Sequence, residues 1–400
     1  MITCLAFSIP FSDAYSKKIL AITFIIWLFY IKIKDLRQLL KNRVIIVLSL
    51  FILSHCFTLF WSENISLGLH YISQMWRYLF IPLLIYTTTV QKDEIKYILH
   101  AFVFSMFINE IISYLIYVDL YQTEFSKTRG YPVGFLNHIQ YSVLVAFSSI
   151  LILYQSLDMK NLFTKILYRV FFVTMTTNLV ISGGRTGYIV YFVSLLVLFF
   201  IYFKPSIKSF ILVLLFPTVT FFIGCKYNSQ VEARMLATLN EINQAKNNNY
   251  NTSIGMRLAY YPLTYDMLKQ PENSFLYGVG MGDLEQEMIK AEQRTKLIKH
   301  HLPHLHSSYL TAYVNGGIMG LILLLLFLYY LLKLNIKDKD LLFIKYLFIL
   351  NMSISMLPDI ILTQKTMMIY FSLFISILLI QHNTEQETKE KEDILKVPFI

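Results

Sequence analysis

The sequence predicts an all-α, polytopic integral membrane protein of about twelve transmembrane helices, with one large external loop that contains amphipathic helices. Composition is the first observation: 56% of the 400 residues are hydrophobic, only 15% are charged, and the mean hydropathy is +0.54. Soluble domains carry about 25% charged residues, so this chain has too few polar side chains to cover a surface in water. The second observation is a succession of apolar runs, and the third is a single long polar interruption at 225–306.

Twelve apolar segments are candidates for spanning helices, each of which needs about 20 mostly apolar residues. They are 1–12, 18–31, 44–60, 71–90, 95–118, 139–157, 163–182, 187–203, 207–224, 308–332, 341–357 and 366–381. The first two are short and could instead form a helical hairpin that crosses only partly. The expected organisation is an N-terminal bundle of about nine helices over 1–224, a large loop over 225–306, about three helices over 307–381 and a tail over 382–400.

The distribution of Lys and Arg predicts the orientation, because cytoplasmic connections are enriched in both. With the N-terminus inside, the inner connections hold nineteen Lys and Arg residues and the short outer connections hold seven. The long loop is not counted, since long segments cross regardless of charge. We therefore expect both termini in the cytoplasm and the loop outside. The net charge of +10 is spread over these connections and forms no single patch, so nucleic acid is not an expected partner.

The large loop contains four kinds of sequence. Residues 240–253 are rich in Asn, and we expect a mobile segment there. The segment 255–270 has apolar and aromatic residues at helical spacing, which predicts an amphipathic helix at the outer boundary of the membrane. The stretch FLYGVGMGD (275–283) indicates tight turns or close backbone approach. The stretch 284–299 has charges of alternating sign, as a solvated helix would.

The segment SGGRTGY (182–188) joins two long apolar runs and is the first candidate site. An arginine near membrane depth costs at least about 2.5–3.5 kcal/mol unless it is paired or in water. Arg185 could sit in a short outer turn and reach the lipid head groups. The functional alternative is an anion site, in which Gly183, Gly184 and Gly187 let backbone amides and the guanidinium converge on phosphate oxygens.

Arg257 follows in the predicted amphipathic helix, within the stretch GMRLAYY. A lone arginine on such a helix is commonly a head-group anchor. The tyrosines that follow, Tyr260, Tyr261 and Tyr265, suit either an interfacial belt or stacking on sugars. Sequence spacing does not decide between these two roles.

Four histidines occur in HHLPHLH, where the loop meets the next apolar run. Zinc is disfavoured because no cysteine is near and no HExxH pattern is present. A histidine that enters a spanning helix can act as a general base, since its ordinary pKa is near neutrality. His306 and His304 are nearest the membrane, whereas His300 and His301 are expected to be solvated. The alternative is a polar cap at the interface.

Two weaker candidates lie upstream. Asn137, His138 and Gln140 open one apolar run, and Arg77 lies beside Trp76 at the outer end of another. Either group could line a cavity or only mark the membrane interface. The sequence contains no Walker loop, dinucleotide fingerprint or nucleophile elbow.

The order of the motifs from about 180 to 325 resembles that of a known family. An intramembrane S-G-G-R-T-G is followed by a long loop that carries R-L-x-x-Y and P-E-N-S-F-L-Y-G-V-G-M-G-D, and then by H-S-S-Y-L-T-A-Y-V-N-G-G. This resembles the O-antigen ligase and polymerase superfamily, bacterial inner-membrane glycosyltransferases that use glycans linked to undecaprenyl pyrophosphate.

The resemblance implies that the protein moves a glycan from undecaprenyl pyrophosphate to a sugar hydroxyl of lipid A–core, at the periplasmic face and without nucleotide, metal or other cofactor. The family's membrane arginine falls on Arg185, its loop arginine on Arg257, and its H-N-x-x-L histidine on His306. Ser307 replaces the Asn of that motif, and His304 takes the role if the register slips by two residues. The resemblance also implies that the loop covers the site.

Two other functions stay open. A polymerase of the same superfamily would use the same lipid-linked donor with a lipid-linked acceptor. A transporter or flippase of lipid-linked polysaccharide would need charged residues paired across several helices at mid-bilayer, and inverted repeats. The candidate residues instead cluster at the outer end of the predicted helices, which favours chemistry at the membrane surface.

Overall fold

A computed structural model describes residues 1–11, 13–31, 33–88, 92–129, 131–202, 207–299, 301 and 303–395. These ranges are helical and contain no β-strand beyond one isolated bridge between Ser274 and Gly278. The N-terminal helices are α1 (Ile2–Ser8), α2 (Asp13–Tyr30), α3 (Ile33–Leu40), α4 (Arg43–Phe57), η1 (Thr58–Phe60), α5 (Ile65–Met75), α6 (Arg77–Thr87), α7 (Lys92–Tyr117), α8 (Glu124–Arg129), α9 (His138–Leu157), α10 (Leu162–Ile181), α11 (Arg185–Tyr202) and α12 (Ile207–Tyr227). The remaining helices are α13 (Ser229–Lys246), α14 (Ser253–Leu268), α15 (Leu284–Thr295), α16 (Ser308–Leu332), α17 (Lys339–Ser355), η2 (Ile361–Thr363) and α18 (Lys365–Leu395).

Six helical segments of the described ranges are long and apolar enough to cross a membrane. They are Arg43–Phe60, Glu94–Tyr117, His138–Leu157, Arg185–Tyr202, Ser308–Leu332 and Lys365–Thr388. All six coincide with segments that the sequence analysis selected. The other six selected segments also contain helix, in α1, α2, α5 with α6, α10, α12 and α17. The all-α fold and the apolar helices are thus confirmed, whereas the count of twelve spans stays a prediction.

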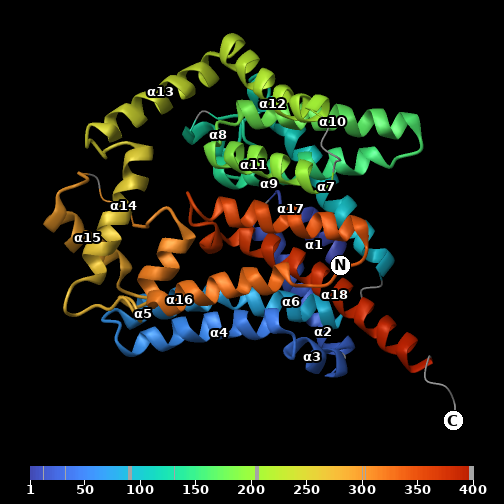
Figure 1. The fold of residues 1–400 in the computed structure, drawn as a ribbon, viewed down its shortest axis with the longest axis horizontal. Helices are drawn as coiled ribbons and strands as arrows, with labels where there is room; N and C mark the ends of the chain where they lie inside the picture. The colour runs from blue at the N-terminus through green and yellow to red at the C-terminus, as the bar shows by residue number, and fades with distance from the viewer. Residues whose placement is uncertain are drawn as a thin grey trace.

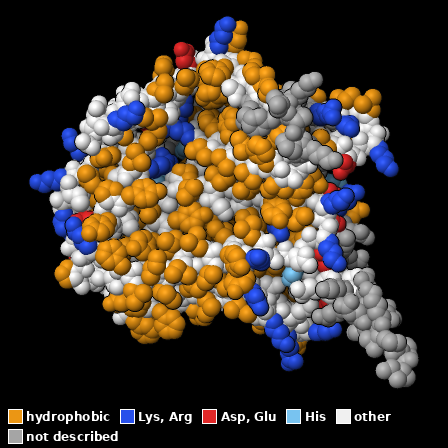
Figure 2. Space-filling view, in the orientation of Figure 1, with side chains coloured by type: hydrophobic (Ala, Val, Ile, Leu, Met, Phe, Trp, Pro, Cys, Tyr) orange, Lys and Arg blue, Asp and Glu red, His pale blue; other side chains and the backbone are white. Residues whose placement is uncertain are grey.

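The surface has the distribution of side chains that a lipid environment requires. Figure 2 shows hydrophobic side chains over most of one face, with Lys and Arg side chains mainly toward its left and right edges. Large apolar residues are exposed on several helices, among them Phe29, Phe163 and Phe200, whose exposed fractions are 80%, 74% and 53%. In a chain with so little charge, such surfaces are stable against acyl chains and unstable against water.

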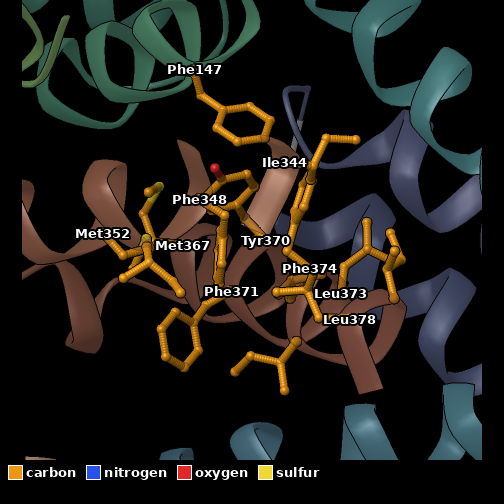
Figure 3. Packing of buried hydrophobic residues seen from close by; sticks show 14 of the residues in the cluster. Phe147, Ile344, Phe348, Met352, Met367, Tyr370, Phe371, Leu373, Phe374 and Leu378 are labelled. Atoms are coloured by element: carbon orange, nitrogen blue, oxygen red, sulfur yellow. The ribbon is translucent and has the colours of Figure 1, made fainter. Parts of the chain in front are cut away.

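The main core lies where α9, α17 and α18 meet. Phe147 of α9 contacts Phe374 of α18 edge-on, with ring centroids 4.9 Å apart. Phe348 of α17 stacks on the same ring at 5.4 Å, and Tyr370 packs against all three (Figure 3). These rings are fully buried and interdigitate, so dispersion between close-packed aromatic side chains holds the central helices together.

Residues 228–307, which we name the external segment after the location that the sequence predicts, have a smaller core of their own. Helices α14 and α15 lie at the left end of Figure 1, and the C-terminal part of α18 lies at the opposite end. Buried side chains of α14, including Tyr260 and Leu263, pack with Met288 of α15 and with Val314 in the first turns of α16. The helices predicted over 255–270 and 284–299 are therefore present, as α14 and as α15, which ends at Thr295.

Residues 240–253 differ from the mobile segment that their Asn content predicts. Helix α13 continues to Lys246, and Thr252 then caps α14 by accepting a hydrogen bond from the Gly255 amide. Asn has a low helix propensity, but Asn228 begins α13 as its N-cap, where Asn is strongly preferred. The sequence analysis had not predicted this helix.

Helix α16 is broken at Gly317, whose φ of +62° is open to glycine and strained for other residues. The loop before α15 fills the break. The Val279 amide donates to the Val314 carbonyl at 2.8 Å, and the Ile318 amide donates to the Phe275 carbonyl at 2.9 Å. Backbone groups that the break would leave unpaired are thus bonded to the external segment, as an apolar environment demands.

Candidate functional site

Asp359, in the connection between α17 and η2, is the centre of a buried polar cluster. Its carboxylate accepts hydrogen bonds from the Thr186 hydroxyl, at the start of α11, and from Arg257 of α14 at 3.4 Å. His306 Nδ1 lies 3.4 Å from the same carboxylate oxygen as Arg257. The Asp359 side chain is 2% exposed, so it is a buried charge with three polar partners, as a buried carboxylate requires. Three segments far apart in the sequence meet on this one side chain.

Arg185 lies at the first position of α11 and forms a bidentate ion pair with Glu241 of α13. Nη1 and Nη2 donate to the two carboxylate oxygens at 2.6 and 2.8 Å. The Glu241 carboxylate also accepts from the Ile254 amide at 3.1 Å. Burial raises the pKa of Glu241, but the Arg185 guanidinium outweighs burial and the net pKa is lowered. Arg185 Nε is buried without a hydrogen-bond partner among the described residues, so this guanidinium keeps an unused donor.

Arg257 is held in place by four hydrogen bonds from its guanidinium. Nε donates to the Pro358 carbonyl at 2.9 Å, and Nη1 donates to the carbonyl and hydroxyl of Ser253 at 3.0 and 2.7 Å. Nη2 makes the contact with Asp359. Because Ser253 is one helical turn earlier on α14, the helix itself orients this side chain.

His304 and His306 lie against each other on the chain that leads into α16. Their rings are perpendicular, with centroids 4.1 Å apart, and Tyr260 stacks on His306 at 6.1 Å. His306 has a φ of +45°, a strained conformation for a residue with a side chain. His304 Nδ1 is buried without a hydrogen-bond partner in the described part of the chain. Burial, and then the neighbouring His306, lower the pKa of His304 to about 4.

A cavity of about 330 Å³, which we name the cationic cavity, opens beside this cluster. Arg185, Arg234 and Arg257 line it, and apolar side chains such as Phe221 and Leu239 form most of its remaining wall. Arg234 of α13 packs over the Tyr131 ring at 5.4 Å, and its Nε is buried without a partner among the described residues. Figure 2 shows Lys or Arg side chains in the hollow below α13. Burial and the charge of Arg185 lower the pKa of Arg234.

Three guanidinium groups in one largely apolar cavity can in principle bind an anion with several oxygens. Arginine binds phosphate oxygens through paired, planar donors, and it does so more strongly where water is excluded. Two carboxylates, Glu241 and Asp359, neutralise part of this charge. The cavity therefore suits a ligand with an anionic head and an apolar tail.

The family comparison supports this chemistry. Residues 170–325 match the family model described as O-antigen ligase. The match covers 156 of the 400 residues and makes this segment similar to the O-antigen ligase and polymerase superfamily. A search of the curated proteins finds no match to the chain. Members of the superfamily are glycosyltransferase-like, and together with the six apolar helices the match indicates a bacterial membrane protein.

The match to the O-antigen ligase family includes Arg185, Arg234, Arg257 and both histidines of the cluster, whereas Asp359 lies outside the matched residues. The structure brings together Arg185, Arg257, His304, His306 and Tyr260, all of which the sequence analysis had selected. Asp359, which lies beyond the matched segment, contacts two of these residues, Arg257 and His306.

Gly183 and Gly184, also selected as substrate contacts, line neither the cationic cavity nor its rim. A Cβ on Gly184 would approach the Ser142 Oγ to 2.2 Å, and a Cβ on Gly187 would approach the Ser142 Cβ to 2.4 Å. Gly183 has a φ of +69° and lies under the Tyr131 ring. Gly184 and Gly187 therefore let α11 begin in close contact with α9, whereas Gly183 makes room for the Tyr131 ring.

Three other selected residues, Tyr261, His138 and Arg77, lie away from the cluster. The exposed fraction of Tyr261 is 57%, and its helical position turns it from Tyr260. His138 packs on Tyr131 at 5.6 Å. Arg77 donates to the Gln74 carbonyl at 3.1 Å and lies over Trp76 at 5.3 Å. His300 lies outside the described residues, and His301 pairs with Glu292 at 2.9 Å.

The sequence analysis missed Asp359, Glu241 and Arg234. Arg234 and Glu241 are seven residues apart, which places them on one face of α13, and this spacing was a usable signal. Asp359 is an isolated acidic residue after a proline at the outer end of an apolar run. Within the described residues, no group of three or more His, Cys, Asp or Glu side chains could hold a metal ion.

Proposed function

We propose that this protein is an O-antigen ligase, which transfers a polysaccharide from undecaprenyl pyrophosphate to a sugar hydroxyl of lipid A–core. The observation that carries the proposal is the placement of three arginines in one cavity, next to the cluster of His306 and Asp359. The family match supplies the class of reaction. The reaction would take place at the periplasmic face of the bacterial inner membrane, under residues 225–306, with both termini in the cytoplasm.

The donor's pyrophosphate would bind Arg185, Arg234 and Arg257, with its prenyl chain along the apolar wall of the cationic cavity. Glu241 occupies two donors of Arg185 in the absence of an anion. The pyrophosphate would compete with this carboxylate for Arg185 and use the free donors of Arg185 and Arg234. In the transition state the leaving group gains negative charge, so preorganised guanidinium groups lower the barrier.

In the chemical step, the acceptor hydroxyl oxygen attacks the anomeric carbon of the glycan. A C–O bond forms there as the bond from that carbon to the pyrophosphate oxygen breaks, and the electron pair leaves with undecaprenyl pyrophosphate. The hydroxyl proton passes to His306 Nε2, because Nδ1 faces Asp359 and the carboxylate stabilises the imidazolium that forms. His304, whose pKa is about 4, stays neutral at pH 7 and orients the hydroxyl.

Transfer in vitro tests this proposal. Purified protein in detergent, with a lipid-linked glycan and lipid A–core and with chelator present, should form glycosylated lipid A–core. R185A and H306A should each reduce the rate at least about 100-fold. Wild-type rates in both variants would overturn the assignment of the site.

A polymerase of the same superfamily is the alternative, because the family match covers both. The two functions differ in the acceptor. A deletion strain that lacks all O-antigen on its lipopolysaccharide indicates a ligase, whereas a strain whose core carries a single repeat unit indicates a polymerase. Transfer to a lipid-linked glycan in vitro would support the polymerase in the same way.

A further inference from the structure

A second cavity lies on the other side of the Asp359 cluster and contrasts with the first in its charge. It has a volume of about 220 Å³, and we name it the neutral pocket. Among the described residues, its lining contains no Lys or Arg and one carboxylate, Glu285, whereas three arginines line the cationic cavity. A pyrophosphate would find no counter-charge in the neutral pocket.

The two cavities share a thin wall of backbone. Pro358 lines the cationic cavity and Ile360 lines the neutral pocket, so Asp359 is the residue between them. On one side, Thr186 and Arg257 contact the Asp359 carboxylate. On the other, Ser308 lines the neutral pocket and donates its hydroxyl to the Asp359 carbonyl at 3.0 Å. A group in the cationic cavity would therefore meet Thr186 and Arg257, which bond the Asp359 carboxylate, and a group in the neutral pocket would meet Ser308 and His304, whose ring packs against that of His306.

The neutral pocket has polar atoms that lack protein partners. Asn315 lines it with an exposed fraction of 4%, and its Oδ1 is buried and makes no hydrogen bond with the described residues. His304 lines it too, with its unpaired Nδ1. His55, which is 2% exposed, uses Nδ1 on the Phe51 carbonyl at 2.8 Å. In the neutral imidazole this leaves Nε2 as a hydrogen-bond acceptor.

Buried polar groups are normally hydrogen-bonded, and three incompletely bonded side chains in one pocket point to a ligand that completes them. The aromatic rings of Phe51, Tyr71 and Tyr78 line the same pocket. Hydroxyl groups and C–H faces alternate on a sugar ring, which therefore matches a lining of amide, imidazole and aromatic side chains. A purely apolar ligand would leave these groups unpaired.

We propose that the neutral pocket binds the acceptor sugar, so that donor and acceptor approach the reaction centre from opposite sides of Asp359. This inference rests on the proposed glycosyl transfer and adds the location and chemical class of the second substrate. The acceptor is a neutral polyhydroxylated ring, and its reacting hydroxyl lies toward His304 and His306. The ring could belong to lipid A–core or to a lipid-linked glycan.

Kinetic constants for each substrate test the inference. N315L keeps the branching of the side chain at Cγ and removes both hydrogen-bonding groups, and Q74L removes both groups from a half-buried residue of the lining. Each variant should raise KM for the acceptor about tenfold, the cost of one lost hydrogen bond, with KM for the donor unchanged within about twofold. R234Q, the matched variant in the cationic cavity, should raise KM for the donor and leave KM for the acceptor unchanged.

The assay uses two acceptors, lipid A–core and the lipid-linked glycan, with the wild-type protein and each variant. Only variants that give a single peak in detergent gel filtration are assayed. A wild-type protein that transfers to neither acceptor refutes the proposed function. Transfer by the wild type with an unchanged acceptor KM in N315L and Q74L, or with a raised donor KM instead, refutes the neutral pocket as the acceptor site. If N315L does not fold, Q74L alone decides.

Discussion

The helical core and the external segment are stabilised by different forces. In the core, aromatic rings of α9, α17 and α18 pack without a charge among them. In the external segment, carboxylates fix the backbone: Asp283 accepts the amides of Glu63 and Asn64 at 2.8 Å each, and Asp266 pairs with Arg294 at 2.7 Å. Asp359 and Arg185 lie where the two meet. The core thus supplies rigidity, while specific polar bonds place the reactive groups, and the two contributions can be separated by mutation.

The largest expected effect is a loss of transfer activity on substitution of Asp359, which lies where the helical core and the external segment meet. D359N keeps the size of the side chain and removes the charge shared by Thr186, Arg257 and His306. We expect the transfer rate to fall about 100-fold, because the histidine loses its anionic partner and Arg257 its ion pair. D266N is the matched control, since this carboxylate also binds an arginine, Arg294, but its partners among the described residues do not include Thr186, Arg257 or His306. Equal rates in the two variants would contradict a role for Asp359.

The second expected effect is a loss of folding stability on substitution of an aromatic residue in the helical core. F374A removes a fully buried ring that contacts Phe147, Phe348 and Tyr370. It should cost about 3–5 kcal/mol of folding free energy, seen as a lower midpoint of thermal unfolding in detergent. KM values of the protein that stays folded should not change. F163A, at a ring that is 74% exposed, is the control and should leave the midpoint unchanged.

A smaller effect is expected where the loop joins η1 and α5. D283N replaces one of the two carboxylate oxygens that accept the Glu63 and Asn64 amides with a donor. The loss of this bond should cost about 1–3 kcal/mol and should increase proteolytic cleavage of the external segment relative to E272Q, an exposed residue of the same segment. Unchanged cleavage would show that the amides do not anchor the loop.

The smallest effect concerns pH. Burial, and then His306, lower the pKa of His304 to about 4 from an ordinary value of 6.5. Between these values the unfolded chain binds more protons than the folded chain, so stability is lost as the pH falls from 6.5 toward 4. The wild type should therefore lose more thermal stability between pH 7 and pH 5 than H304N does. Parallel curves for the two proteins would mean that His304 is not buried as a neutral group.

Sequence patterns predicted most of the fold, because apolar runs of about 20 residues leave few structural alternatives. Arg185 and His306 were selected for a similar reason, since a polar group at the edge of an apolar run is costly and therefore informative. Arg257 was selected through the family resemblance. Asp359 and Glu241 were missed because their roles depend on pairing with residues more than 50 positions away. The spacing of Arg234 and Glu241 indicates a shared helix face, but no local pattern identifies such distant partners. The packing of Gly184 on α9 and of Gly183 under Tyr131 is likewise set by distant residues.

The break in α16 has a consequence for how the chain is assembled in the bilayer. Residues 275–280 supply the backbone partners around Gly317, and they precede α16 in the chain. The groups that complete the helix are therefore synthesised before α16 itself. In the topology that the sequence predicts, they would lie outside when α16 enters the membrane, and insertion of α16 and docking of the loop would be one event. The wall of the neutral pocket at Asn315, two residues before the break, would take its shape in that event.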